Sequence, residues 1–389
     1  VLYLALLLHD IGKGRKEDHS KLGSRIASKV CSRLGLSKSD SETIEWLVKN
    51  HLLMSDVAQK RDLSDPRTVR DFATLVESRT KLKLLTVLTA CDIRAVGPGV
   101  WNNWKAQLIR NLYYLTHKAL SSGLEDVGEI ATVDEAQNAL KKKLVGWDSN
   151  IIEHELGRHY KSYWQGLNSE THFIMANMLK DMSNIESKLE LIPDKDKDAT
   201  MACFVISDHP GIFSRLAGAV ALAGANVVDA RTYTSSDGFA TAVFWLQDSK
   251  GTPYEKDGFS KLKKAIDNSL SGDVITREAL NDKDKIKKRE RDFCIPTEIL
   301  FDNEGSEIYT IIEVDTRDRP GLLFDLTNTI FAANIYIASA VIATYGVQAV
   351  DVFYVKDLFG LKLHSKSKRD SLSKKLMNAI DYGVKRATS

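Results

Sequence analysis

Five side chains of the types that bind divalent metals lie in the first quarter of the sequence. His9 and Asp10 are adjacent, and His19, His51 and Asp92 follow at wider spacing. Imidazole and carboxylate groups together suit Mn, Fe, Zn or Mg better than Ca. Such a metal lowers the pKa of bound water from roughly 15.7 to about 7 and neutralises the charge that develops on a phosphoryl group. These residue types therefore point to a shared divalent cation as one way to satisfy them all.

Each of these residues also has a simpler interpretation. A single His on an apolar helix face, such as His51, is most often a hydrogen-bonded core residue, and an Asp late in a helix, such as Asp92, is usually a cap or an ion-pair partner. Lys13 and Arg15 follow the His-Asp pair, where their charges either contact phosphate or face solvent. Because spacing does not show that the side chains converge, both interpretations stay open at this stage.

Helices must position these residues, because residues 1 to about 185 have a helical pattern. The segment 41–55 places three apolar residues and His51 on one helix face, at spacings of three and four residues. The segment 80–96 repeats this pattern around Asp92. The sequence thus predicts a helical region that carries the candidate ligands.

The second half of the chain has a different pattern and contains a repeat. Residues 194–198 alternate Asp and Lys, and we interpret them as a linker. Strand-like and helix-like segments follow, and the sequence Asp208-His-Pro-Gly matches Asp318-Arg-Pro-Gly at an offset of 110 residues. A repeat of this length indicates two copies of one small α/β domain.

Each copy places Asp-x-Pro-Gly between a strand and a helix. The Gly allows an unusual backbone conformation or a close approach, and the helix start offers free N–H groups that attract a carboxylate. This pattern favours an amino acid ligand, although a tight turn without a ligand would use the same residues.

The composition limits the other classes of function. A chain of 389 residues should hold two to four domains, and 43% apolar residues suffice for packed cores. The 54 basic and 52 acidic side chains nearly cancel, which gives no electrostatic case for nucleic acid binding. The longest apolar stretch, Val1–Leu8, is too short to span a membrane. Four cysteines lie far apart without CxxC spacing, so we expect a reducing, cytoplasmic compartment and no thiolate zinc site.

The stretches LLLHDIGKG, DHSKLG, VKNHLLM and TACDIRAVGPGVWNNWK together resemble the HD superfamily of metal-dependent phosphohydrolases. The resemblance implies that His9, Asp10 and Asp92 are core ligands of Mg or Mn, and that His19 and His51 bind a second metal. The candidate catalytic residues are therefore His9, Asp10, Lys13, His19, His51 and Asp92. The superfamily's first His lies on an earlier helix. Because the chain lacks an initiator Met and starts as if within a helix, we expect a fragment without that ligand.

The repeated D-x-P-G-[IL]-[LF] signature resembles the ACT domain, a ferredoxin-like regulatory module that often binds amino acids between paired copies. Asn226 matches a position that commonly contacts the ligand's polar groups, and Tyr336 stands at that position in the second copy. The candidate glutamine-binding residues are Asp208, Pro210, Gly211, Ile212, Asn226, Asp318, Pro320, Gly321 and Leu322.

An HD domain followed by two ACT domains resembles the bacterial bifunctional PII uridylyltransferase/uridylyl-removing enzymes, here without their N-terminal nucleotidyltransferase domain. The expected fold is multidomain, with an all-α HD-type helical domain before two α+β ferredoxin-like (βαββαβ) ACT domains. We expect the HD domain with a helical extension at 1–190, the first ACT domain at 198–290 and the second at 307–389.

This resemblance implies a nitrogen-status sensor. The HD domain would hydrolyse the phosphodiester that joins UMP to a tyrosine of the PII protein, and glutamine at the ACT pair would promote this removal. The intact protein would also transfer UMP from UTP to PII. Two alternatives stay open, namely a guanosine tetraphosphate hydrolase, which also combines HD and ACT modules, and a non-catalytic amino-acid-binding regulatory protein.

Overall fold

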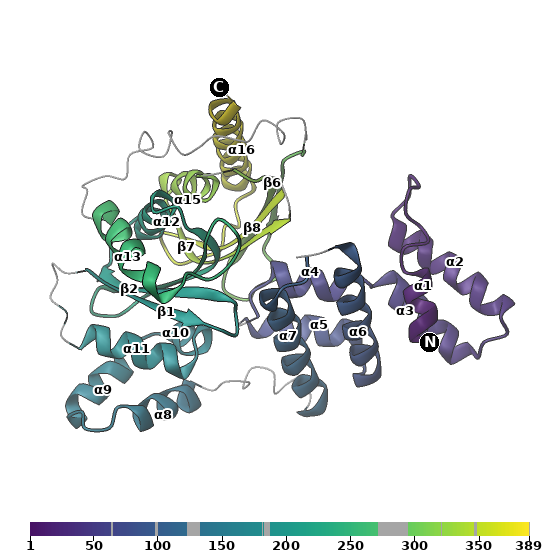
Figure 1. Ribbon diagram of the computed structural model, residues 1–389, viewed down its shortest axis with the longest axis horizontal. Helices are drawn as coiled ribbons and strands as arrows, with labels where there is room; N and C mark the ends of the chain where they lie inside the picture. The colour runs from purple at the N-terminus through teal and green to yellow at the C-terminus, as the bar shows by residue number, and fades with distance from the viewer. Residues whose placement is uncertain are drawn as a thin grey trace. The chain divides into compact units, whose positions relative to one another are not determined.

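The computed structural model describes residues 1–63, 65–97, 100–122, 133–180, 182, 187–270, 295–319, 321–345 and 348–388. The chain divides into two compact units, Val1–Ile130 and Ala131–Ser389. In the described ranges unit 1 is helical, and every strand belongs to unit 2 (Figure 1).

Unit 1 consists of amphipathic helices with polar caps at several of their starts. The Asp18 carboxylate accepts hydrogen bonds from the amides of Ser20 and Lys21 at the start of α2, and Asp65 caps α5 directly before Pro66. The helices of unit 1 are α1 (Leu2–Leu8), α2 (His19–Arg33), α3 (Lys38–Lys49), α4 (Leu53–Lys60), α5 (Pro66–Val76), α6 (Arg79–Val96) and α7 (Asn103–Ser122).

The core of unit 1 lies where α1, α3 and α6 meet. Ala5, Ile44, Leu47, Leu85 and Leu88 are fully buried there. Burial of each large aliphatic side chain stabilises the unit by roughly 1.5–3 kcal/mol. Since α1 packs against both α3 and α6, and α2 packs against α3, the ends of these helices are held close together.

Unit 2 is built on one eight-stranded antiparallel sheet, with strand order β1-β2-β4-β3-β7-β8-β6-β5. The strands are β1 (Ser187–Asp194), β2 (Ala199–Ser207), β3 (Asn226–Thr234), β4 (Phe239–Gln247), β5 (Glu298–Asp302), β6 (Thr310–Arg317), β7 (Ile335–Tyr345) and β8 (Gln348–Asp357).

Each half of the sheet has the ferredoxin-like arrangement, which confirms the expected fold class. The order of the elements along the chain nevertheless differs from βαββαβ. The fourth strand of each half comes first rather than last, as β1 beside β2 and β5 beside β6, so that each half reads ββαββα. Both strands precede residues 198 and 307, where we expected the two domains to begin.

The linker predicted at residues 194–198 is wrong, because these residues form the hairpin turn between β1 and β2. Asp194 pairs with Ala199 across the two strands, and the Asp194 carboxylate accepts a hydrogen bond from the amide of Lys197. Asp198 adopts the left-handed conformation, with φ 50°. A short charged turn and a linker have the same composition, so the sequence pattern does not distinguish them.

The two halves of the sheet meet through backbone pairing of β3 with β7. Ala230 pairs with Ala340, its equivalent in the repeat, and the flanking pairs are Asp229 with Val341 and Arg231 with Ser339. At the offset of 110 residues, Asp229 is equivalent to Ser339 and Arg231 to Val341, so the two flanking pairs are equivalent to each other. The two halves are therefore related by a local two-fold axis that passes between the paired alanines.

Helices cover both faces of the first half of the sheet. One layer carries α12, α13, α15 and α16, and the opposite side of the first half carries α8 to α11 (Figure 1). All nine residues of β4 are buried, which explains its continuous apolar sequence. The helices of unit 2 are α8 (Val133–Lys143), α9 (Ser149–Gly157), α10 (Lys161–Gly166), α11 (Ser169–Leu179), α12 (Ile212–Leu222), α13 (Lys256–Leu270), α15 (Leu322–Ala332) and α16 (Lys366–Thr388).

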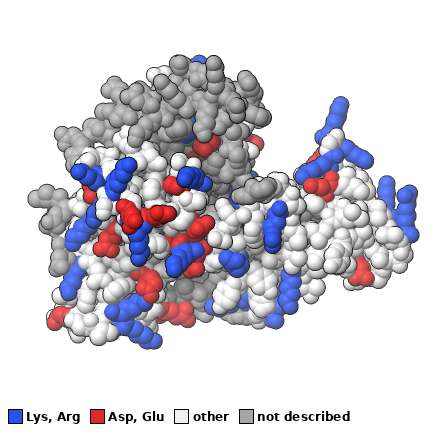
Figure 2. Space-filling view, in the orientation of Figure 1, with Lys and Arg blue, Asp and Glu red and all other residues white. Residues whose placement is uncertain are grey.

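The charged surface is mixed. Lys and Arg side chains are interspersed with Asp and Glu on the face shown in Figure 2, in keeping with the formal net charge of +2. Among the described residues, no helix combines the length and the apolar character that crossing a membrane requires.

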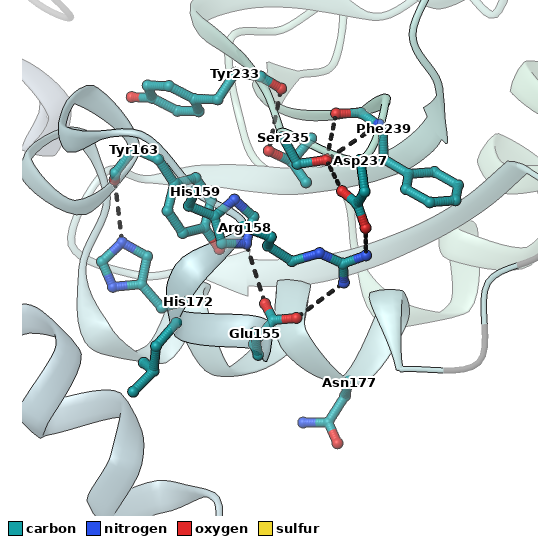
Figure 3. Close-up of polar contacts among 12 residues, drawn as sticks. Glu155, Arg158, His159, Tyr163, His172, Asn177, Tyr233, Ser235, Asp237 and Phe239 are labelled. Atoms are coloured by element: carbon teal, nitrogen blue, oxygen red, sulfur yellow. Dashed lines mark hydrogen bonds and ion pairs between the residues drawn. The ribbon is translucent and has the colours of Figure 1, made fainter. Parts of the chain in front are cut away.

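A buried ionic network fastens α9 to the hairpin between β3 and β4 (Figure 3). Arg158 donates to Glu155 at 3.0 Å and ion-pairs with Asp237, and its carbonyl accepts the amide of Ser236 at 2.8 Å. Burial acts to raise the pKa of Glu155, but the adjacent His159 and Arg158 outweigh it, so the pKa lies below its usual value. Glu155 is therefore held ionised in the interior by the Arg158 guanidinium and by its hydrogen bond with His159.

His172 on α11 lies next to this network, without any exposed surface. Its Nε2 atom is 3.2 Å from the carbonyl oxygen of Tyr163 (Figure 3). Burial lowers the pKa of His172 to about 4, so the ring is neutral at pH 7.

Candidate metal centre

Five residues from four helix ends or faces converge in unit 1. His9 and Asp10 directly follow α1, His19 is the first residue of α2, His51 lies just after α3, and Asp92 lies in the last turns of α6. Ligand atoms of Asp10, His19 and His51 lie within 4.8 Å of one another, as do those of His9, Asp10 and Asp92. The Asp10 carboxylate belongs to both groups.

The distances within the centre are those of a compact cluster. The Nε2 atom of His9 is 3.2 Å from Asp10 Oδ2 and 3.4 Å from Asp92 Oδ1. The Nε2 atom of His51 is 3.7 Å from Asp10 Oδ1, and the ring centroids of His51 and His19 are 5.3 Å apart. His51 is 1% exposed, whereas the Asp10 side chain is 32% exposed, so the centre joins a buried side chain to one that solvent reaches.

Backbone carbonyls fix which nitrogen of two imidazoles faces the centre. The Nδ1 atoms of His9 and His51 each lie 2.7 Å from a carbonyl oxygen, that of Leu6 and Val48 respectively. A carbonyl only accepts hydrogen bonds, so Nδ1 carries the proton in both rings and Nε2 presents a lone pair. This is the arrangement that metal-binding histidines use.

Two atoms of the centre need a partner that the described residues do not supply. Asp10 Oδ1 and His51 Nε2 are buried, and no described residue forms a hydrogen bond with either. Leaving such atoms unpaired is unfavourable by roughly 1–3 kcal/mol each. A divalent cation would satisfy both, so the donor set fits a metal.

The charge states of these groups also fit a metal. Burial lowers the pKa of His51, which keeps its ring neutral and able to bind a cation. Burial acts to raise the pKa of Asp10, but the hydrogen bond and positive charge of Lys13, together with the adjacent imidazoles of His9 and His51, hold the pKa below its usual value. Lys13 Nζ lies 2.6 Å from Asp10 Oδ2, so this candidate phosphate contact touches a ligand carboxylate in the structure.

A pair of glycines allows the close packing that brings the ligands together. A Cβ atom on Gly12 would overlap the carbonyl oxygen of His19 and approach the amide nitrogen of Gly23 to 3.0 Å. A Cβ atom on Gly23, in α2, would lie 3.2 Å from Cγ1 of Val48 in α3. Sequence reasoning did not single out either glycine as a packing contact, because a contact between segments leaves no signal in the spacing of residues.

The helix expected to carry His51 ends two residues earlier, at Lys49. Asn50 leaves the helical conformation, with φ −111° and ψ 19°, and its side-chain Nδ2 donates to the carbonyl of Trp46. His51 therefore lies in a turn rather than on the helix face. Its apolar neighbours on α3, Ile44 and Leu47, are buried as expected.

The candidate ligand residues of the first repeat lie at two ends of the sheet. Asp208 follows β2, and its carboxylate accepts a hydrogen bond from Thr234 Oγ1 at 2.8 Å. Gly211, with φ 86°, follows Pro210 and precedes Ile212, the buried first residue of α12. Asn226 starts β3 at the opposite end, where its side-chain amide donates to the carbonyl of Asp248.

Residues of the second repeat pack onto the first D-x-P-G loop. A Cβ atom on Gly211 would lie 3.0 Å from the ring of Phe331, at the end of α15. Burial raises the pKa of Tyr336 to about 12, partly offset by a hydrogen bond with Thr234, and the charge of Asp208 contributes. Tyr336 of one repeat thus lies beside the loop of the other, a contact that sequence reasoning did not anticipate.

In the second repeat, Asp318 follows β6, and Gly321, with φ 74°, precedes α15. Leu322 is the buried first residue of that helix. Pro320 lies outside the described residues.

The comparisons with known proteins agree with this division of the chain. The HD domain family matches residues 1–92, and the ACR family N-terminal ACT domain matches residues 306–381. The chain is 63% identical over 387 residues to the bifunctional uridylyltransferase/uridylyl-removing enzyme of Cereibacter sphaeroides, covering all of this chain and 42% of that protein. The chain is homologous to part of these enzymes.

Two further relatives carry the same name, bifunctional uridylyltransferase/uridylyl-removing enzyme. That of Ruegeria pomeroyi is 60% identical over 395 residues, which cover all of this chain and 43% of that protein. That of Azospirillum brasilense is 45% identical over 387 residues, which cover 97% of this chain and 41% of that protein. The chain thus spans about two fifths of the length of the uridylyl-removing enzymes it matches. The HD match at residues 1–92 includes the five converging residues, and HD domains are metal-dependent phosphohydrolases.

Proposed function

We propose that the HD domain of this chain hydrolyses the phosphodiester that joins UMP to a tyrosine of the PII signalling protein. The convergence of His9, Asp10, His19, His51 and Asp92 within an HD domain carries this proposal. The names of the relatives support a uridylylated substrate, and the choice of PII is our inference from the family resemblance.

The five residues would hold Mg or Mn, with His9, Asp10 and Asp92 at one position and His19 and His51 with Asp10 at the other. When bound, such a metal activates a water molecule for attack and neutralises charge on the phosphoryl group. The chain's own residues prepare this chemistry. The carbonyls of Leu6 and Val48 orient two imidazoles. Lys13 lies on the exposed side, where its ammonium group can contact the phosphate as well as Asp10.

The tandem repeats would regulate this activity by binding glutamine. We assign both halves of the sheet as ACT domains, the first half by its structural equivalence to the second. Glutamine would bind where a D-x-P-G loop of one repeat meets the strand start of the other, near Asp208 and Tyr336 or near Asp318 and Asn226. In the intact protein, UTP-dependent uridylylation of PII would be the opposing activity.

The experiment that tests this proposal uses the full protein, uridylylated PII, Mn and increasing glutamine. We expect release of UMP that rises with glutamine, and loss of release in Asp10→Ala and Asp92→Ala variants. UMP release retained by both variants would contradict the catalytic assignment. Hydrolysis that does not respond to glutamine would leave the HD assignment intact and remove the regulatory one.

We also propose a cytoplasmic location. Cys31, Cys91 and Cys203 are free thiols in the described part of the chain. Free thiols of this kind are typical of a reducing compartment.

A further inference from the structure

The exposed face of α2 carries one cation in every turn. Lys21, Arg25, Lys29 and Arg33 follow one another at spacings of four residues, and all four are exposed. The sequence of α2, HSKLGSRIASKVCSR, contains no acidic residue. The helix therefore presents an uninterrupted row of positive charge that starts two residues after the candidate ligand His19.

The stability of α2 does not account for this row. Like charges four residues apart repel one another on a helix. Lys21 also lies in the first turn, where the helix dipole disfavours a cation. Of the four cations only Arg33, in the last turn, is placed where the dipole favours it. A solvent-facing helix side that served stability alone would alternate the two signs of charge.

An open groove of about 550 Å³ lies beside the middle of this row, at Arg25 and Lys29. Arg15, Arg25 and Lys29 line it together with the apolar side chains of Leu22 and Ile26, and Glu45 of α3 contributes to its wall. Arg25 also ion-pairs with Glu17. Figure 2 shows several Lys and Arg side chains that stand out from this end of unit 1. We call this surface, with Lys21 and Arg33, the α2 groove.

The α2 groove and the candidate metal centre belong to one continuous segment. Arg15 lies in the loop that joins Asp10 to His19, and α2 continues from His19. From Lys21 to Arg33 the helix rises about 18 Å, at roughly 1.5 Å per residue. An extended peptide of five or six residues covers about the same length, at roughly 3.3 Å per residue.

We propose that the α2 groove binds an acidic, extended segment of the protein that bears the UMP group. This inference rests on the proposed function, in which the substrate is a protein and must be oriented beyond its single phosphodiester. The row of cations would pair with carboxylates, while Leu22 and Ile26 would contact intervening apolar side chains. The groove lining includes no aromatic residue on which a base could stack, which disfavours a single-stranded nucleic acid as the occupant.

The test compares an Arg25→Ala/Lys29→Ala variant of the full protein with a control variant, Lys38→Ala/Lys83→Ala. The control removes the same charge from exposed positions of α3 and α6 in the same unit. For uridylylated PII we expect the KM of the groove variant to rise about 2- to 30-fold with kcat unchanged, the range for loss of two exposed ion pairs. Hydrolysis of a small diester, bis(4-nitrophenyl) phosphate, should be the same in wild type and both variants.

Three results would overturn the proposal. One is an unchanged KM in the groove variant, and another is an equal rise in the control variant. The third is competition by an RNA oligonucleotide but not by a poly-glutamate peptide. If the wild type does not release UMP at all, the proposed function fails instead. Fluorescence anisotropy with labelled uridylylated PII would then still measure how much the α2 groove contributes to binding affinity. Binding that the groove variant weakens and the control variant does not would then support the α2 groove alone.

Discussion

A single methyl group at Gly12 should impair the candidate metal centre without changing any candidate ligand side chain. In a Gly12→Ala variant, the new Cβ would overlap the carbonyl oxygen of His19 and crowd the amide of Gly23. Both contacts are to backbone, so no side-chain rotation relieves them. The loop that carries Asp10 and the start of α2 must separate by about 1 Å to restore van der Waals contact.

The expected size of the effect follows from that displacement. Overpacking of this kind costs about 1–3 kcal/mol of stability, and a shift of about 1 Å at reacting groups lowers the rate about 100-fold. The separation moves His19 away from Asp10, so we expect weaker binding of Mn as well as slower hydrolysis. The control is Gly157→Ala, which adds a methyl group at an exposed position with nothing within 4 Å.

The assay is a calorimetric titration of the full protein with Mn, followed by release of UMP from uridylylated PII. The melting temperature of each variant, measured in parallel, distinguishes a displaced loop from an unfolded unit. A Gly12→Ala protein that binds Mn and releases UMP as the wild type does, while remaining folded, would refute the argument that this glycine sets the distance between the loop and α2.

Two further predictions concern unit 2. Because the folded pKa of His172 is about 4 rather than 6.5, the unfolded state binds a proton that the folded state does not. Stability should therefore fall by up to about 3 kcal/mol as the pH drops from 6.5 to 4, and a His172→Gln variant should lose this part of the dependence in urea unfolding at pH 7 and pH 4.5. An Arg158→Met variant leaves Glu155 buried without that partner and should cost about 3–5 kcal/mol. An Arg158→Met/Glu155→Leu variant should lose less stability than Arg158→Met in the same urea experiment. An equal or larger loss would show that the unpaired Glu155 carboxylate does not cause the destabilisation.

The residue types of the centre could be predicted from the sequence, but the reasons for their convergence could not. The imidazole and carboxylate residues can be read directly from the sequence, and the helices near them can be predicted from the spacing of apolar residues. The hydrogen bonds from His9 and His51 to backbone carbonyls depend on where each helix ends. The contact of Gly12 with α2 depends on tertiary packing. Neither leaves a pattern in the chain.

Unit 2 gives a similar lesson. The internal repeat correctly predicts two halves of similar fold in unit 2, because similar sequences adopt similar folds. It does not predict that an edge strand comes first in each unit, because most of β1 is exposed or half-buried and Leu189 is its one buried residue. It also does not predict that Tyr336 lies beside Asp208, because that contact arises only when β3 pairs with β7.

The pairing of β3 with β7 has a consequence for any ligand response that unit 2 makes. Two such sheets carried by separate molecules would dissociate on dilution. Here the partner is tethered, so the effective concentration of one half near the other is independent of how much protein a cell contains. Any signal that depends on the seam between Ala230 and Ala340 is then insensitive to expression level.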